Sequence, residues 1–145
     1  MESSFEAPST ESASEGRKKY FSVSEAQRAL PLVSRIVGDI RKAYGQAVEL
    51  EQAYAAAVDR GAGLGRLEQI ENEREGVIVR MNELMEELSG IGCELKDWET
   101  GLCDFPALRD GREVCLCWKD GEERIGHWHE TYAGFGGRQP LDDRV

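Results

Sequence analysis

The sequence has no excess of positive charge and no long apolar run. Lys and Arg together number 18 and Asp and Glu number 28, which gives a net charge of −10 at pH 7. Nucleic acids are bound by basic faces that release counterions, so we expect no nucleic acid partner. No apolar stretch approaches the roughly 20 residues that cross a bilayer, and the acidic, serine-rich start has no apolar signal segment. We therefore expect a cytoplasmic protein with no membrane partner.

The common metal-binding and redox motifs are also missing. The chain has four cysteines and two histidines, and they form no C-x-x-C pair and no H-E-x-x-H helix. In a reducing cytosol, cysteines stay free thiols that pack as small apolar side chains. We expect buried thiols and no cofactor, and the alternative is a transition metal such as zinc or iron.

Length and composition indicate one domain preceded by a leader. A chain of 145 residues normally folds as a single domain. Residues 1–19 are rich in Glu, Ser and Ala, and they hold too little apolar surface to offset the entropy lost on ordering. We expect a disordered acidic leader over residues 1–19 and one domain over residues 20–145.

A helix start is visible just after the leader. Ser22 is suited to the N-cap position, Glu25 follows three residues later as its capping-box partner, and Phe21 precedes the cap as an apolar staple. Pro31 has a ring that clashes inside a helix but fits a first turn. We expect a short opening helix that ends near Leu30 and then a long one, with a kinked single helix as the alternative.

Two series of apolar residues at helical spacing follow Pro31. The first comprises Val33, Ile36, Val37, Ile40, Tyr44, Ala47, Val48, Tyr54 and Val58, and the second comprises Leu67, Ile70, Val77, Ile78, Met81, Leu84, Met85 and Leu88. Gly61, Gly63 and Gly65 separate them, which predicts an antiparallel helical hairpin. Both apolar stripes are wider than the seam of an isolated coiled coil. Each helix therefore needs a second neighbour, either the C-terminal block or a second copy of the chain in a homodimer.

The C-terminal block is typical of β structure. Residues 112–118 and 122–129 are rich in Val, Leu, Ile, Cys and Trp, and the turn residues Lys119, Asp120 and Gly121 separate them. A two-stranded ribbon is marginal alone, so we expect it to lie on the helices or to pair with a third strand around residues 102–105 or with a partner chain. The predicted fold class is α+β, a long antiparallel helical hairpin with a small antiparallel β ribbon.

This block also carries a family resemblance. The residues that carry it are Lys96, Asp97, Gly101, Leu102, Asp104, Phe105, Pro106, Cys117, Trp118, Lys119, Gly121, Glu122, Trp128, His129, Gly134, Phe135, Gly137 and Arg138. With Phe21, Glu25, Ala26, Leu30 and Pro31 near the start, they make the chain resemble the uncharacterised bacterial family catalogued as domain of unknown function 2203. The chain departs from that pattern at Cys115 and His127. The resemblance implies no activity.

One chemical hypothesis is a metal site of cysteine and histidine. Cys115 and Cys117 lie two apart, as do His127 and His129, so each pair shares one face of its strand. A two-residue turn at Asp120 and Gly121 puts the two pairs on opposite faces, whereas a three-residue turn puts them on the same face. In either register Cys117 lies far from His129, and Cys115 with His127 is the close pair. The candidate metal ligands are Cys115, His127 and His129.

A second hypothesis is a small anion-binding pocket. Lys96, Asp97 and Asp104 precede the ribbon and Arg138 follows it. If the ribbon folds back on this segment, these charges converge beside Trp118, Trp128 and His129 and form a ligand site. The structural alternative is that Asp104 caps a turn and Arg138 pairs with Asp97 or Asp104.

The sequence completes no catalytic motif. We therefore expect a non-enzymatic, dimeric helical scaffold that binds itself or a protein partner. The alternative is a small-anion or metal-binding protein, with or without enzymatic activity, whose site lies in the C-terminal block of Trp, His, Asp and Arg.

Overall fold

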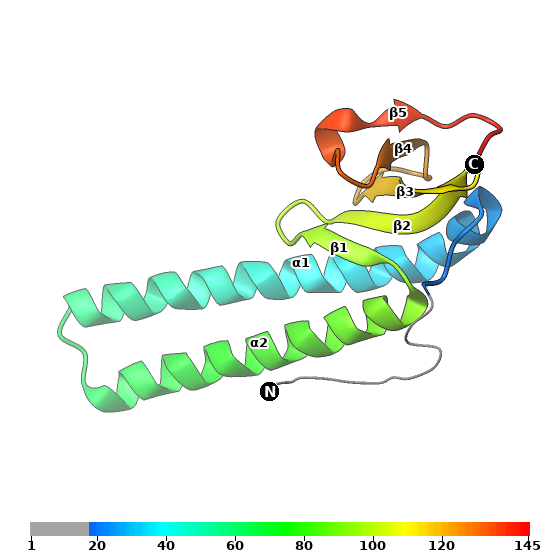
Figure 1. Ribbon diagram of the computed structural model, residues 1–145. Coiled ribbons are helices and arrows are strands. Elements are labelled where there is room, and N and C mark those ends of the chain that lie inside the picture. The colour runs from blue at the N-terminus through cyan, green and yellow to red at the C-terminus, as the bar shows by residue number, and fades with distance from the viewer. Residues whose placement is uncertain (1–17) are drawn as a thin grey trace, which may run out of the picture.

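The computed structural model describes residues 18–145 and shows two long helices beside a five-stranded sheet (Figure 1). The helices are α1, Val23–Asp59, and α2, Leu64–Ile91. They pack against each other as an antiparallel hairpin, and the sheet follows them in the chain. The predicted α+β class and helical hairpin are confirmed. Most of the predicted acidic leader, residues 1–17, lies outside the described residues.

The capping box predicted at the start of α1 is present. The Ser22 hydroxyl accepts a hydrogen bond from the Glu25 backbone N–H at 3.0 Å. The Glu25 carboxylate accepts one from the Ser22 backbone N–H at 2.9 Å, and this bond is the main cause of a lowered pKa for Glu25. Two backbone donors at the helix start are thereby satisfied, which fixes where α1 begins.

The predicted helix end near Leu30 is wrong, because α1 runs without interruption through Pro31. Leu30 and Val33, on either side of the proline, are buried, whereas Pro31 itself is exposed. Pro31 therefore lies on the solvent-facing side of α1, and the burial of the opposite, apolar face holds the helix together. Packing overrides the local propensity to end the helix.

A short turn and a glycine cap complete the hairpin. The helix α2 begins at Leu64, so Gly65, expected in the interrupting segment, lies inside it. Gly92 ends α2 in the left-handed conformation with φ of 112°, and its N–H bonds to the Leu88 carbonyl. This conformation is cheap only for glycine, so the cap explains the stop. No helix within residues 18–145 combines the length and apolarity that crossing a membrane requires.

The sheet has five strands in the order in which they occur in the chain. They are β1, Glu94–Asp97; β2, Leu102–Arg109; β3, Arg112–Lys119; β4, His127–Glu130; and β5, Gln139–Pro140, with a 3-10 turn, η2, at Phe135–Gly137 before the last. All neighbouring strands are antiparallel. The strand β2 is the third strand predicted around residues 102–105, and it pairs with β3 as expected, although it continues to Arg109.

The predicted tight turn at Lys119–Gly121 is wrong, because β3 and β4 are paired but a longer loop joins them. Residues 120–126 form a loop, and the strand predicted over 122–129 is limited to His127–Glu130. The tight hairpin turn of the sheet is instead Asp110–Gly111, with φ of 53° and 83°, which joins β2 to β3. Two consecutive positive φ values match the right-handed twist of a hairpin, and Asp-Gly is among the sequences that favour them.

The two faces of the sheet differ in character. The face toward the helices is apolar and includes Cys103, Phe105, Ala107, Val114, Leu116, Trp118 and Trp128. These side chains form one core with α1 residues such as Val33, Val37 and Ile40 and with Leu84 and Leu88 of α2. The opposite face carries the polar residues of β2, β3 and β4 and lies below the segment from β4 to β5 (Figure 1).

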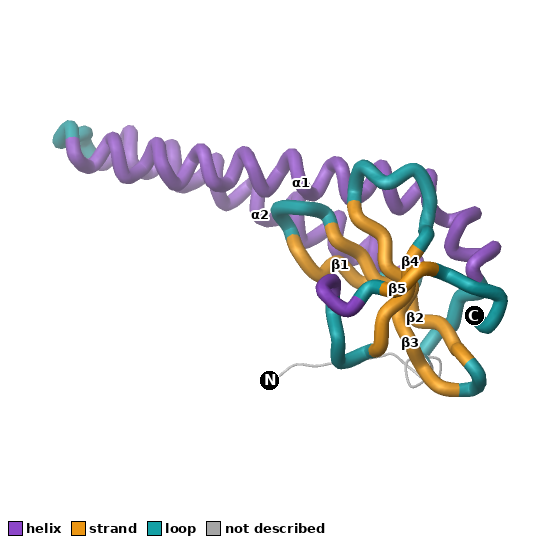
Figure 2. Tube along the Cα trace, turned by 90° about the horizontal axis from the view of Figure 1, so that it is seen from above, coloured by secondary structure: helices purple, strands orange, loops and turns teal. Residues whose placement is uncertain are grey.

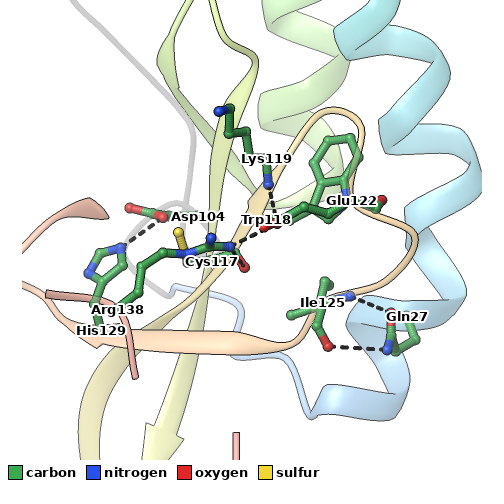
Figure 3. Close-up of polar contacts among 9 residues, drawn as sticks. All are labelled: Gln27, Asp104, Cys117, Trp118, Lys119, Glu122, Ile125, His129 and Arg138. Carbon is green, nitrogen blue, oxygen red and sulfur yellow. Dashed lines mark hydrogen bonds and ion pairs between the residues drawn. The ribbon is translucent and has the colours of Figure 1, made fainter. Parts of the chain in front are cut away.

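Side-chain contacts attach the loops to α1. Gln27 exchanges two hydrogen bonds with the backbone of Ile125, at 3.0 and 3.3 Å (Figure 3). Arg41 binds the Glu99 carbonyl and the Asp120 carboxylate, both at 2.9 Å. The sheet covers only the part of the hairpin near these contacts, and the far end projects beyond it (Figure 2). The need for a second neighbour is therefore met for the inner half of the hairpin.

Candidate functional site

Three neighbouring strands bring three ligand-type side chains together on the polar face. Asp104 of β2 lies opposite Cys117 of β3, and β4 contributes His129. Their exposed fractions are 4%, 0% and 2%. One potential ligand atom from each lies within 4.8 Å of the others, and no other such group of three His, Cys, Asp or Glu residues occurs within residues 18–145. Figure 3 shows the three side chains pointing toward one another.

Both ring nitrogens of His129 have partners. Nδ1 is 2.7 Å from the Glu130 carbonyl oxygen, and Nε2 is 3.0 Å from Oδ1 of Asp104. A carbonyl oxygen only accepts, so Nδ1 must carry the hydrogen and donate it. In the neutral ring Nε2 then carries no hydrogen, and its lone pair faces the lone pairs of the Asp104 carboxylate. This contact is favourable only if a cation, either a proton or a metal ion, lies between Nε2 and Asp104.

Cys117 is the third member of the cluster. Burial, and next the Asp104 carboxylate, raise the pKa of the Cys117 thiol to about 11, against the opposing effect of the Arg138 guanidinium. The free thiol is therefore protonated at neutral pH, which disfavours a role as a nucleophile. Cys115 is also shifted, because burial raises its pKa to about 11. All four cysteines, Cys93 and Cys103 of the core among them, are free.

Arg138 lies beside the cluster and does not pair with the predicted carboxylates. Its Nη2 donates to Glu122 at 2.8 Å and to the Cys117 carbonyl at 3.3 Å (Figure 3). This pairing lowers the pKa of Glu122 and raises that of Arg138. The guanidinium also lies over the Phe135 ring, 4.7 Å from its centroid. Arg138 thus ties the segment before β5 to β3.

The structure separates Trp118, Trp128 and Asp97 from the cluster and keeps Lys96 on the same face of the sheet. Trp118 and Trp128 lie on the helix-facing side of the sheet, away from His129. Asp97 accepts hydrogen bonds from Thr100 and the Glu99 backbone, so it shapes the turn between β1 and β2. Lys96 is on the same face as Asp104 and forms an ion pair with Glu94 at 2.9 Å, which raises the pKa of Lys96.

The register of β3 and β4 corrects the pairing expected from the sequence. Cys115 lies opposite His129, and Cys117 lies opposite His127. The expected close pair, Cys115 with His127, is therefore wrong, and the cysteines and histidines share a face. Cys115 and His127 do not join the cluster. Nδ1 of His127 is buried and has no hydrogen-bond partner among residues 18–145.

A pocket opens over two members of the cluster. Its volume is about 280 Å³, and it is lined by Lys96, Leu102, Asp104, His129, Thr131, Tyr132, Ala133, Gly134 and Phe135. The last five belong to the segment that follows β4 and passes over the polar face. Cys117 does not line the pocket, so a molecule in it would meet the cluster on the side of Asp104 and His129.

Sequence reasoning placed Asp104 and His129 in a ligand site but kept Cys117 apart from His129. One signal in the sequence, the Asp110–Gly111 turn, could have brought Asp104 and Cys117 together. Counting outward from this turn, Arg109 pairs with Arg112 and Asp104 pairs with Cys117. The antiparallel register then puts both side chains on one face.

Comparison with known proteins gives a family and no functional relative. No curated protein and no solved structure matches the chain. One family model matches residues 19–141, which is nearly all of the described part. The chain therefore belongs to the family described as Uncharacterized conserved protein (DUF2203).

Proposed function

We propose that this protein binds one divalent transition metal ion, such as zinc or iron, through Asp104, Cys117 and His129. The observation that carries the proposal is the buried contact between Nε2 of His129 and Oδ1 of Asp104, with the Cys117 thiol beside it. A cation between these atoms resolves the opposition of lone pairs. These three ligands differ from those expected from the sequence, Cys115, His127 and His129, and only His129 is common to both sets.

The donor set and its spacing fit such an ion. Imidazole nitrogen, thiolate sulfur and carboxylate oxygen are the usual ligands of zinc. Tetrahedral bonds of about 2.0 to 2.3 Å separate neighbouring ligand atoms by roughly 3.3 to 3.6 Å. The 3.0 Å between His129 and Asp104 is slightly shorter than this spacing, and all three ligand atoms lie within 4.8 Å of one another. Small side-chain shifts would complete the geometry.

The surroundings of His129 also support a metal. A histidine that binds a metal commonly donates its other N–H to a carbonyl or carboxylate, which fixes the ring. The bond from Nδ1 to the Glu130 carbonyl is such an interaction. A cysteine that coordinates a metal ion is deprotonated and releases its proton to solvent, so the high pKa of the free Cys117 thiol is no barrier. Three protein ligands leave at least one coordination position for water or a small molecule.

Metal analysis of the purified protein and of three variants tests the proposal. We expect about one zinc or iron per chain, and we expect Asp104→Asn, Cys117→Ser and His129→Gln each to weaken zinc binding by more than about 100-fold. Loss of a ligand should exceed the 10- to 100-fold effect of a residue that only supports one. Cys115→Ser, on the same face but outside the cluster, should bind zinc normally.

Measuring how zinc changes the stability of the natural chain tests the proposal even if the variants fold poorly. Zinc at about 100 times its dissociation constant should stabilise the natural chain by about 2.7 kcal/mol, and a chelator should remove this gain. If zinc does not bind and chelation does not change the melting temperature, the cation between His129 and Asp104 is a proton. The pair is then a buried imidazolium–carboxylate ion pair, and the metal proposal fails.

A second candidate function is a dimeric helical module for protein interaction. It is supported by the outer half of the hairpin, where α1 and α2 project beyond the sheet (Figure 2). A groove of about 620 Å³ between them is lined by Ala43, Gln46, Glu49, Leu50, Ala53, Glu73, Gly76, Val77 and Arg80. Its apolar residues are suited to packing against a second hairpin.

Sedimentation of Leu50→Glu and Leu32→Glu tests this second function. We expect a homodimer at about 10 micromolar, a concentration at which large interfaces persist. Leu50→Glu should weaken the dimer at least about tenfold, because it puts a charge in the apolar groove. Leu32→Glu, at an exposed leucine of α1 outside the groove, should not. A natural chain that sediments as a monomer contradicts the dimer and leaves the metal proposal unaffected.

A further inference from the structure

The pocket over the candidate metal site has a polar floor, and its walls combine polar and apolar side chains. Asp104 and His129 lie at its base, and Leu102, Ala133 and Phe135 contribute apolar surface. Lys96, Thr131 and Tyr132 are the polar residues that line it away from the cluster. Its volume of about 280 Å³ is at the small end for ligand pockets, which favours a small molecule as the occupant.

The charges around the pocket favour an anion. A divalent ion bound to one carboxylate, one thiolate and a neutral imidazole has no net charge, so its open position accepts either water or an anionic oxygen. Lys96 is the one cationic residue among those lining the pocket. Its ion pair with Glu94 is on the surface, with 44% of the lysine side chain and 70% of the glutamate side chain exposed. Such a pair is weak, so Lys96 can turn toward a ligand.

We infer that this pocket binds a small aliphatic carboxylate, with one oxygen on the metal and the negative charge beside Lys96. The inference rests on the metal site proposed above. A carboxylate with a short alkyl group matches the pocket better than inorganic phosphate does, because phosphate would leave polar oxygens against Leu102 and Phe135. Cys117 does not line the pocket, so a carboxylate bound there would not compete with the Cys117 thiol.

Cobalt(II) provides a visible probe of this arrangement. Cobalt(II) accepts the same nitrogen, oxygen and sulfur ligands as zinc, and its absorption changes when a coordination position changes. We expect propionate to shift the visible spectrum of the cobalt-loaded protein in a saturable way. Propionamide, of the same shape and without charge, should have little effect, and inorganic phosphate should bind more weakly than propionate.

Variants on the pocket wall identify the residue that recognises the charge. Lys96→Gln should raise the dissociation constant for propionate about five- to tenfold with cobalt content unchanged, the effect of losing one ion pair of about 1 kcal/mol. Glu94→Gln frees Lys96 and should lower the constant. Lys119→Gln is the matched control, because Lys119 lies near Phe135 but does not line the pocket.

The outcomes separate this inference from the metal proposal. A protein that takes up no cobalt overturns both. Full cobalt content with a spectrum that propionate does not change overturns the carboxylate inference alone. A spectrum that changes equally with propionamide, or equally in Lys96→Gln, shows that charge is not recognised and also overturns it.

Discussion

Trp118→Ala is expected to lower the free energy of unfolding by about 3 to 5 kcal/mol, the usual loss for a buried large aromatic residue. Trp118 is only 1% exposed and lies between the sheet and α1, in the core that joins them. Its indole N–H donates to the Glu122 carbonyl at 2.9 Å (Figure 3). Alanine would leave a cavity at this contact and remove the donor for that carbonyl.

Denaturant unfolding followed by circular dichroism and fluorescence measures this effect. Trp98→Ala is the matched control, because Trp98 is only partly buried and stacks on Tyr44 with centroids 6.4 Å apart. Its loss should cost about 1 to 2 kcal/mol. Both signals should change together in Trp118→Ala. If the unfolding midpoint followed by circular dichroism is unchanged while the midpoint followed by fluorescence falls, the hairpin is stable without the sheet. The shared core would then not be what stabilises the hairpin.

Gly101→Ala is expected to destabilise the protein by about 2 to 5 kcal/mol. Gly101 has φ of 74°, which costs a residue with a side chain roughly 1 to 2 kcal/mol. A methyl group here would also lie 2.7 Å from Cβ of Asp120 and 2.9 Å from side-chain atoms of Val37 and Arg41. Overpacking of this kind typically costs about 1 to 3 kcal/mol. The site is where two turns of the sheet meet α1, so the atoms that crowd it have little room to move.

Gly111→Ala separates the two causes. Gly111 also has a positive φ, of 83°, but an added methyl group would meet nothing within 4 Å. Gly111→Ala should therefore lower the free energy of unfolding only by the cost of the positive φ, about 1 to 2 kcal/mol. Thermal or denaturant unfolding of both variants gives the comparison. Equal losses would mean that the contact of Gly101 with α1 is looser than the distances indicate.

The parts of the fold that depend on local signals could be predicted from the sequence. The helical spacing of the apolar residues gave the hairpin, and Ser22 with Glu25 gave the start of α1. Both follow from interactions within a few residues. Pro31 shows the limit of such signals, because its local preference is outweighed by burial of Leu30 and Val33 against the distant sheet. That contact is not visible in the segment itself.

The sheet was less predictable because its register depends on which turn is tight. Lys119–Gly121 and Asp110–Gly111 both contain Asp-Gly, and only the second joins two paired strands directly. Lys119 and Asp120 instead return toward α1, where Asp120 binds Arg41. A shift of register by one residue exchanges the two faces of a strand. The meeting of Asp104, Cys117 and His129 could therefore not be derived without the register. The separation of His129 from Trp128 could have been predicted, because consecutive residues of a strand point to opposite faces.

The order of the strands has a consequence for how the protein is made. Each strand pairs with those next to it in the chain, and the two helices that precede them pair with each other. Such a chain can fold progressively from its first helix while the ribosome is still adding residues. Asp104, Cys117 and His129 all come from the final third of the sequence. A nascent chain that stops before β4 lacks His129, so the cluster with Asp104 and Cys117 can assemble only after β4 has been added.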